Sequence, residues 1–376
     1  MITRPVHITI AGGGTGGHVQ PAIAVADVLL SEEDVELSWI GSSTGIEQQS
    51  ATERGIPFVS IPTGKLRRYF SLYTLTDALR IPLGIVRARM HLRRLQPDVI
   101  YSTGGFVSVP TVVAGWMAGI PVITHEQTAT IGLANKINAR LSNRIALAFE
   151  ATRSLVPANS DKIVVTGNPV RGALVAGNPV TGREAFGLPD GLPLVYVTGG
   201  SLGAQAINET VRILIPDLVR DACIVHQCGP AAGNGDYPRL IEARNALPGE
   251  LRERYVVRER IGAELADLYA AADLVVGRSG AGTVAELALL GKPSILIPLP
   301  GTASDEQTQN ARILASAGAA LLLHQAELTP TVLLSQISAL LNDAKGRMEM
   351  AAAARSVAQP DAARLLAREI LDLARR

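Results

Sequence analysis

Three short glycine-rich segments stand where a chain could hold an anion. They are residues 12–17, followed directly by His18, then Gly104 and Gly105, and finally residues 199–203. Each follows a strand-like run and precedes a helical pattern, so its backbone N–H groups lie at a helix N-terminus, which carries about half a positive charge. Any one of these loops could instead be a tight turn that binds no ligand. Three such loops together favour phosphate binding at the carboxyl ends of parallel strands.

The first loop also matches the dinucleotide fingerprint GxGxxG, at Gly12, Gly14 and Gly17. That fingerprint requires an acidic residue at the end of the next strand, where it binds the ribose hydroxyls. The next strand ends in the sequence Gly-Ser-Ser at residues 41–43, without an acid. A nicotinamide or flavin cofactor is therefore disfavoured, and a P-loop is excluded because GxxxxGK[ST] does not occur.

Several polar residues after strand-like runs could act on a sugar nucleotide. His18 begins a helix, whose dipole favours the neutral imidazole that a general base requires, although a packing role is the alternative. Glu286 could bind ribose hydroxyls or close a capping box with Thr283. The polar run at residues 305–310 suits sugar hydroxyls or a solvated helix start. Since there is no Asp-x-Asp pair, we expect no metal site and a diphosphate held by helix dipoles, amides and an arginine.

The elements that must position these residues form two similar halves. Residues 6–17 and 194–204 each contain a strand, a glycine turn and the start of a helix, and further strand-like runs alternate with helical patterns in both halves. The fold class predicted is α/β, with two Rossmann-like doubly wound parallel-sheet domains facing a cleft. We place the first domain at residues 1–166 and 359–376, and the second at 167–358. A chain of 376 residues is long enough for two cores.

Composition narrows the classes of protein further. The net charge of +1 argues against a dedicated nucleic-acid binder. Cys223 and Cys228 do not form CxxC and stand in or beside an apolar run, so two buried or half-buried thiols are expected in a reducing compartment. No stretch of 18 apolar residues lacks a breaker, and the N-terminus resembles a first strand rather than a signal peptide. These features predict a cytoplasmic location.

The order of the motifs resembles a known family. The segments are GGGTGGHVQPA, STGGFVSVP, HEQ at 125–127, GNPVR at 167–171, GGSLGA, RSGAGTVAELALLGKP and DEQTQNA at 305–311. Together they are similar to the N-acetylglucosaminyltransferases that complete the lipid-linked peptidoglycan precursor on bacterial membranes. The resemblance covers essentially the whole chain. It implies the two-domain glycosyltransferase fold called GT-B and inverting transfer of N-acetylglucosamine from UDP-N-acetylglucosamine to the 4-hydroxyl of an N-acetylmuramyl-pentapeptide on diphospho-undecaprenol. No cofactor is implied.

The resemblance also implies roles for single residues. His18 would be the base, with His125 as the second candidate, or as an orienting pair with Glu126. The acceptor diphosphate would lie on Gly13, Gly14, Gly104 and Gly105. The donor would contact Thr15, Gly16, Gly17, Arg171, Gly200, Ser201, Leu202, Gly203, Asn208, Ile261, Glu286 and Gln307. Within this set Arg171 and the 199–203 loop take the diphosphate, Glu286 the ribose, and the backbone of Ile261 the uracil.

Three residues depart from the family pattern. Phe106 stands where tyrosine is common, Thr128 where asparagine follows HEQ, and Glu306 where glutamine or histidine is frequent. Each puts one sugar or acceptor contact in doubt. Other enzymes on the same fold therefore stay as alternatives, namely a UDP-N-acetylglucosamine epimerase or a transferase to another lipid. A catalytically silent scaffold for cell-wall synthesis proteins is an alternative of a different class, against which His18 and Glu286 argue.

The stretch from Lys65 to Arg94 combines eight basic residues with one acid, Asp77, and interleaves them with apolar side chains. This pattern is typical of a helix or loop that rests on an anionic membrane surface. An ordinary surface helix and an RNA-binding segment are the alternatives. Because the resemblance implies a polyprenyl-diphosphate acceptor, we expect the protein on the cytoplasmic side of the membrane as a peripheral protein.

Overall fold

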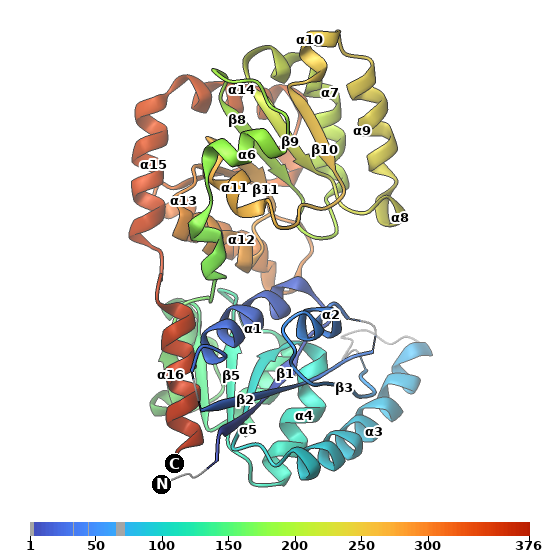
Figure 1. Cartoon of the computed structure of the whole chain (residues 1–376), viewed down its shortest axis with the longest axis vertical. Coiled ribbons are helices and arrows are strands. Elements are labelled where there is room, and N and C mark those ends of the chain that lie inside the picture. The colour runs from blue at the N-terminus through green and yellow to red at the C-terminus, as the bar shows by residue number, and fades with distance from the viewer. Residues whose placement is uncertain (1–3, 33, 44, 65–71) are drawn as a thin grey trace. The chain divides into compact units, whose positions relative to one another are not determined.

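The chain divides into two compact units in a computed structural model that describes residues 4–32, 34–43, 45–64 and 72–376 (Figure 1). Unit 1 comprises residues 1–171 and 359–376, and unit 2 comprises residues 172–358. Residues 167–171, which the sequence analysis assigned to the second domain, therefore group with the first unit. The local reason is close packing, because a Cβ atom on Gly167 would lie 2.5 Å from Cβ of Gln359.

Unit 1 is built on a seven-stranded parallel sheet in the order β3-β2-β1-β4-β5-β6-β7. The strands are β1 (Val6–Gly12), β2 (Val35–Gly41), β3 (Phe58–Ser60), β4 (Val99–Gly104), β5 (Val122–Glu126), β6 (Arg144–Leu147) and β7 (Ile163–Val165). The helices are α1 (Gly16–Leu29), α2 (Glu47–Thr52), α3 (Leu72–Leu95), α4 (Gly105–Met117), α5 (Leu133–Leu141) and α16 (Ala362–Ala374), with 3-10 turns at Glu150–Leu155 and Ser160–Lys162.

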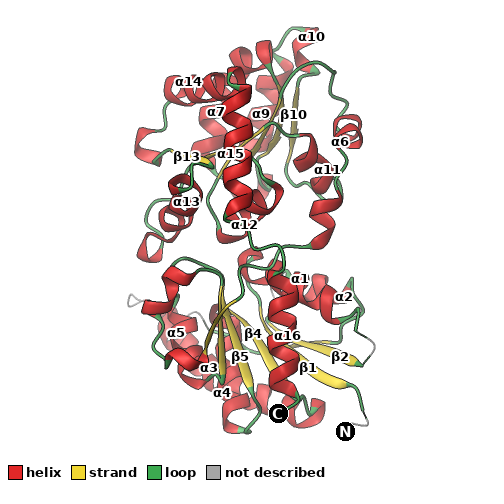
Figure 2. Cartoon of the chain, turned by 90° about the vertical axis from the view of Figure 1, so that its left-hand side faces the viewer, coloured by secondary structure: helices red, strands yellow, loops and turns green. Residues whose placement is uncertain are grey.

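Helices cover both faces of this sheet because alternate strand residues are apolar on both sides. Ile8 and Ile10 of β1 pack in one cluster with α1 and α16, whereas Ile100 of β4 packs in another with α3 and α4. The C-terminal helix α16 thus belongs to the core of unit 1, and it lies beside α1 (Figure 2). Its buried residues Leu366 and Ile370 are four positions apart, as an amphipathic helix requires.

Unit 2 is built on a six-stranded parallel sheet in the order β10-β9-β8-β11-β12-β13. The strands are β8 (Leu194–Thr198), β9 (Cys223–Gln227), β10 (Tyr255–Arg258), β11 (Leu274–Gly277), β12 (Ser294–Leu296) and β13 (Ala320–Leu322). The helices are α6 (Pro179–Ala185), α7 (Gln205–Asp221), α8 (Ala231–Asn234), α9 (Asp236–Asn245), α10 (Gly249–Arg252), α11 (Leu265–Ala271), α12 (Ala281–Leu290), α13 (Glu306–Ser316), α14 (Pro330–Asn342) and α15 (Ala344–Ser356). Short 3-10 turns lie at Gly172–Ala176, Ala303–Asp305 and Gln325–Glu327.

The two parallel sheets with alternating helices confirm the predicted fold class. Thr329 followed by Pro330 predicts a helix N-cap from the sequence. Helix α14 confirms it, since the Thr329 side chain accepts a hydrogen bond from Val332 N at 3.3 Å and Pro330 is the first helical residue. Cys223 and Cys228 are free and buried, as expected. Two elements were not predicted from the sequence: the edge strand β3, which has only three residues, and helix α15.

Candidate functional site

The predicted glycine loops lie at the point of each sheet where strand order reverses. In unit 1, β1 and β4 are neighbours although β2 and β3 intervene in sequence, and Gly12 pairs with Gly104. In unit 2, β8 and β11 are neighbours in the same way. Loops that follow such neighbouring strands diverge to opposite faces of the sheet and leave a crevice between them. The structure therefore brings the first two glycine loops together within unit 1.

The conformation of the first loop requires glycine. Gly13 has a φ of 151° and Gly14 a φ of 86°, and α1 then begins at Gly16 with Thr15 as an extended N-cap residue. Thr15 and Gly17 are exposed, and Gly16 is half-buried. Gly104 and Gly105 also have positive φ values, of 85° and 74°.

A buried carboxylate that was not predicted from the sequence accepts a hydrogen bond from this loop. Glu47 of α2 is fully buried and accepts hydrogen bonds from Gly14 N at 3.0 Å, from Ser42 N at 2.8 Å and from the Ser42 hydroxyl at 2.6 Å. An acid thus does meet the glycine loop, but it comes from the following helix rather than from the strand end. Because Gly14 N donates to Glu47 and Gly104 N donates to the Ser102 hydroxyl at 3.3 Å, two of the four amides expected to bind the acceptor diphosphate already have partners.

His18 lies against the second glycine loop. Its Nδ1 is 2.9 Å from the carbonyl oxygen of Thr103 and 3.2 Å from Oε1 of Gln127, and within the described part of the chain its Nε2 has no hydrogen-bond partner. A Cβ atom on Gly105 would lie 2.9 Å from Cδ2 and 3.2 Å from Nε2 of the ring, so glycine at 105 leaves room for this edge of the imidazole. Partial exposure and a free Nε2 are what proton abstraction requires.

The other histidine proposed from sequence, His125, is enclosed. It is fully buried on β5, its Nε2 is 3.0 Å from the carbonyl oxygen of Gly167, and its Nδ1 is 3.3 Å from Nε2 of Gln127. Burial lowers the pKa of His125 to about 4, so the ring is neutral near pH 7. With both nitrogens engaged inside the fold, this histidine is placed to orient its neighbours.

Glu126 is similarly engaged, and it explains the departure at residue 128. Its carboxylate accepts hydrogen bonds from the Thr128 hydroxyl at 2.9 Å, from Gly132 N at 3.2 Å and from the Asn135 amide at 3.0 Å. The side chain is only 3% exposed. Thr128, in the place where the family commonly has asparagine, thus ties the loop after β5 to Glu126. The other departure in this unit, Phe106, packs near Gly14, whose added Cβ would be 3.3 Å from the ring.

In unit 2, the loop at residues 199–203 turns tightly between β8 and α7. Gly200 and Gly203 have φ values of 79° and 76°, and Ser201 and Leu202 are exposed. Gln227, at the end of the neighbouring strand β9, links this loop to the predicted uracil contact. Its Nε2 donates to the carbonyl oxygen of Gly200 at 3.0 Å, and its Oε1 accepts from Ile261 N at 3.3 Å.

Glu286 does not take part in the alternative capping box. Helix α12 begins at Ala281 with Gly280 as its N-cap residue, so Thr283 lies inside the helix and cannot be the cap. The helix therefore begins earlier in the chain than its apolar residues alone indicate. The carboxylate of Glu286 instead accepts a hydrogen bond from the hydroxyl of Tyr269 on α11 at 3.0 Å. Tyr269 packs edge-to-face on Tyr196 of β8, with ring centroids 5.5 Å apart, and this packing holds the phenol in place.

The polar run at 305–310 begins with unusual backbone. Ser304 and Asp305 both have positive φ values, of 59° and 52°, which non-glycine residues rarely adopt and which cluster at functional sites. Gln307 accepts a hydrogen bond from Leu299 N at its Oε1, at 3.0 Å, and its carbonyl oxygen accepts from the Ser279 hydroxyl at 2.8 Å. Glu306 and Gln307 are half-buried at the start of α13.

Two predicted donor residues do not belong to these loops. Asn208 is 1% exposed, and its amide donates to the carbonyl oxygen of Cys228 at 2.8 Å and to Asp236 at 2.7 Å, while its Oδ1 is 2.9 Å from Nε2 of His226. It therefore supports the site from within the core of unit 2. Arg171 is half-buried and is the last residue of the first segment of unit 1, whereas the 199–203 loop belongs to unit 2. Its diphosphate contact stays a prediction.

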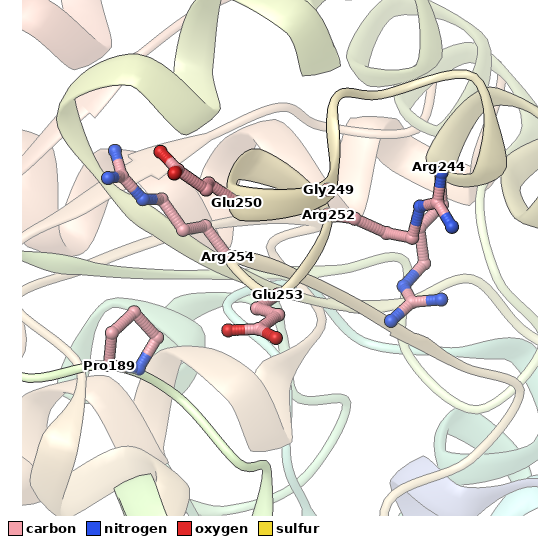
Figure 3. Close-up of a pocket in the computed structure, with 7 residues that line it drawn as sticks. All are labelled: Pro189, Arg244, Gly249, Glu250, Arg252, Glu253 and Arg254. Carbon is pink, nitrogen blue, oxygen red and sulfur yellow. The ribbon is translucent and has the colours of Figure 1, made fainter.

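A hollow of about 670 Å³ in unit 2 is unrelated to these loops. Figure 3 shows its lining, which includes Arg244, Arg252 and Arg254. It lies beside the first residues of β10, at the amino ends of the strands, whereas ligands of open α/β sheets bind at the carboxyl ends. Among the described residues, no group of three or more His, Cys, Asp or Glu side chains is arranged to hold a metal ion.

Helix α3 carries part of the expected membrane segment. Residues 65–71 lie outside the described residues. From residue 80 onward, Gly84, Ala88 and Leu92 are buried towards α4, but the larger Leu83, Val86 and Met90 are 48%, 57% and 50% exposed. Arginines 80, 87, 93 and 94 are exposed on the same helix. Within residues 4–32, 34–43, 45–64 and 72–376, no helix is both long and apolar enough to cross a bilayer.

Comparisons with known proteins match both units. The model of the glycosyltransferase family 28 N-terminal domain matches residues 8–147, and that of the family 28 C-terminal domain matches residues 194–366. A protein of Salinibacter ruber named UDP-N-acetylglucosamine--N-acetylmuramyl-(pentapeptide) pyrophosphoryl-undecaprenol N-acetylglucosamine transferase is 40% identical over 382 aligned positions, which cover 100% of this chain and 99% of that protein. A protein of the same name from Lachnospira eligens is 38% identical over 337 residues, covering 89% and 91% of the two chains.

Solved structures give the same picture. The crystal structure of Acinetobacter baumannii MurG matches with a TM-score of 0.72 and 31% identity, covering 98% of this chain and 100% of that one. A UDP-GlcNAc 2-epimerase from Neisseria meningitidis, solved with UDP-GlcNAc bound, matches with a TM-score of 0.69 over 98% and 100% of the chains. At 15% identity, the second likeness concerns the fold alone.

Proposed function

Because this chain belongs to glycosyltransferase family 28, we propose that it transfers N-acetylglucosamine from UDP-N-acetylglucosamine to the 4-hydroxyl of the N-acetylmuramyl-pentapeptide carried on diphospho-undecaprenol, with inversion at the sugar carbon. Relatives named for this reaction align with almost the whole chain. The observation that carries the chemistry is the placement of His18, whose Nδ1 is bound to carbonyl oxygens while Nε2 faces the glycine loops at the sheet's switch point.

The proposed reaction uses His18 Nε2 as general base. The acceptor 4-hydroxyl oxygen attacks C1 of the sugar opposite the leaving group, and its proton passes to Nε2. The bond between C1 and the diphosphate oxygen breaks, and UDP leaves with that electron pair. A positioned base of this kind contributes about 10²- to 10⁴-fold to the rate. His125 and Glu126 act in this scheme as orienting residues, because both are buried and engaged inside unit 1.

The donor is proposed to bind mainly to unit 2. Glu286, oriented by Tyr269, takes the ribose hydroxyls, and the amides at the N-terminus of α7 with Ser201 take the diphosphate. The backbone of Ile261 reads uracil, and Gln307 contacts the sugar. Arg171 supplies positive charge to the leaving diphosphate.

The acceptor side is proposed to bind to unit 1 at a membrane surface. Among the four predicted backbone amides, those of Gly13 and Gly105 are proposed to donate to the acceptor diphosphate. The amides of Gly14 and Gly104 already donate to groups within the fold. The exposed apolar residues of α3, flanked by arginines, are suited to the boundary between headgroups and acyl chains. On this proposal the protein is peripheral to the cytoplasmic face of the membrane.

The test is transfer of labelled sugar to a short-chain lipid-diphosphate muramyl-pentapeptide, with UDP-glucose and UDP-N-acetylgalactosamine as competing donors. We expect product from UDP-N-acetylglucosamine alone. His18→Ala should lower turnover by about 10²- to 10⁴-fold while UDP binding, measured by calorimetry, stays nearly unchanged. Conversion of the donor to its 2-epimer without transfer would instead support the epimerase alternative, and UDP binding without any turnover would support the scaffold.

A further inference from the structure

The side chain of Gln127 connects His18, in the first turn of α1, with His125, near the carboxyl end of β5. It is 1% exposed, and its Nε2 lies 2.8 Å from the carbonyl oxygen of Thr103, 3.2 Å from that of His125 and 3.3 Å from Nδ1 of His125. Its Oε1 lies 3.2 Å from Nδ1 of His18. Gln127 is the last residue of the HEQ segment at 125–127, and the proposed transfer reaction gives its amide no role.

The surroundings of Gln127 determine which way its amide points. Nε2 of His125 lies 3.0 Å from the carbonyl oxygen of Gly167, so this nitrogen carries the hydrogen, and Nδ1 of the neutral ring is an acceptor. One end of the Gln127 amide thus meets three acceptors, two carbonyl oxygens and this nitrogen. Only the NH₂ group satisfies them, because the reversed amide would place Oε1 against all three and leave buried acceptors unpaired.

The orientation of Gln127 in turn determines the tautomer of His18. Nδ1 of His18 faces two acceptors, the carbonyl oxygen of Thr103 at 2.9 Å and Oε1 of Gln127 at 3.2 Å, so it must carry a hydrogen. In the neutral ring Nε2 then has the lone pair. This is the nitrogen next to Gly105, and it is the one that a general base needs to present to a hydroxyl.

We infer that Gln127 is a positioning residue that holds His18 in the Nδ1–H tautomer and so keeps Nε2 available to take the acceptor proton. The inference rests on the proposed function in so far as His18 acts as the base. When His18 takes up the proton, its charge is shared with two neutral oxygens rather than with a carboxylate, which stabilises the imidazolium only moderately and lets the proton leave again.

No charged group on the neighbouring described elements takes the place of Gln127 as an acceptor at Nδ1 of His18. Glu47 on α2 is bound to Gly14 and Ser42, Glu126 on β5 is bound to the loop at 128–135, and His125 is neutral near pH 7. The acceptors at Nδ1 of His18 are therefore the Thr103 carbonyl and the Gln127 amide, and only the second can be changed by substitution of a side chain.

The direct test is the tautomer of His18 in the full chain, read from ¹⁵N signals of imidazole-labelled protein and assigned with His18→Ala. In the wild-type protein near pH 8 we expect a protonated Nδ1 and an unprotonated Nε2. Gln127→Met keeps the length of the side chain and removes the acceptor, so the two tautomers should mix. Ser142→Ala is the matched control, because Ser142 is equally buried in unit 1 and donates only to the carbonyl oxygen of Asn138.

Kinetics separate positioning from a merely structural effect. Gln127→Met should lower kcat about 10- to 100-fold with little change in KM for the sugar nucleotide, because the donor is bound by other residues. Gln127→Glu should move the acidic limb of the pH–rate profile to higher pH, since a negative charge at Nδ1 stabilises the protonated ring. This second variant also serves if the first does not fold.

Three results would overturn the inference. The first is a wild-type His18 whose hydrogen is on Nε2. The second is a folded Gln127→Met variant with the tautomer and kcat of Ser142→Ala, and the third is a Gln127→Glu variant with an unmoved acidic limb. If the wild-type protein transfers no sugar, the proposed function fails, but the tautomer measurement still decides the role of Gln127 towards His18.

Discussion

Replacement of the exposed apolar residues of α3 should release the protein from anionic membranes. Leu83, Val86 and Met90 are about half exposed in the structure, at 48%, 57% and 50%. Complete burial of such a side chain is worth about 1.5–3 kcal/mol, so insertion of the exposed half contributes about 1 kcal/mol for each residue. The three together contribute about 3 kcal/mol, which corresponds to a change of about 100-fold in the partition coefficient.

The perturbation is the triple variant Leu83→Ser, Val86→Ser and Met90→Ser, and the assay is co-sedimentation with vesicles that contain anionic lipid. The substitutions fall on an exposed face, so the free energy of unfolding should change by little more than about 0.5 kcal/mol for each residue. A matched control is the triple serine variant at Val180, Ile213 and Met348 of unit 2, which are 62%, 50% and 68% exposed. It removes as much exposed apolar surface from helices other than α3.

We expect the α3 variant to bind vesicles about 100-fold more weakly than the wild-type protein at low salt, and the control to bind as the wild-type protein does. Binding should also weaken as salt is raised, because each basic side chain near an anionic surface contributes about 1 kcal/mol that salt screens. Equal losses in the two triple variants, or wild-type protein that does not bind at low salt, would refute the reasoning.

Three further predictions concern buried contacts. Glu47→Gln replaces a carboxylate that accepts three hydrogen bonds, so the free energy of unfolding measured in urea should fall by about 2 kcal/mol, and an unchanged midpoint would contradict this role. Tyr269→Phe removes one hydrogen bond to the carboxylate of Glu286, so KM for the donor should rise about 5- to 10-fold with kcat nearly constant in initial-rate assays. A change confined to kcat would count against this role. Burial lowers the pKa of His226 to about 3, so below pH 6.5 the unfolded chain binds a proton that the folded chain does not, and stability falls with pH by about 2 kcal/mol at pH 5. His226→Gln should lose about that much less stability between pH 7.5 and pH 5 in urea titrations, whereas a parallel loss would show that this histidine is not responsible.

The order of strands and helices could be predicted from the sequence because the signals are local. Runs such as residues 223–227 and 274–277 are short, apolar and bounded by turn residues, and both are strands in the structure. The cap at Thr329 was equally readable, since one side chain bonds to an amide three residues away. The element missed most completely, β3, has three residues and only one neighbouring strand, so it leaves little periodicity to detect.

The start of helix α12 could not be predicted from a local sequence motif. Thr283 and Glu286 have the spacing of a capping box, but α12 begins at Ala281, because the chain leaves β11 and turns at Gly280 before that threonine. The choice between a local cap and a contact with Tyr269 depends on where α11 lies against α12. The spacing of two residues in sequence contains no information about a third residue on another helix.

What the sequence by itself determined is the set of local elements and the glycine turns that end them, because backbone preferences act over a few residues. Only the tertiary structure decided which distant partners the buried charged and polar side chains have. Glu47 meets Gly14 across 33 positions, Gln127 meets His18 across 109, and His125 meets Gly167 across 42. These contacts form because strands distant in sequence become neighbours in the sheet, and burial then requires each polar atom to find whichever partner the fold has placed beside it.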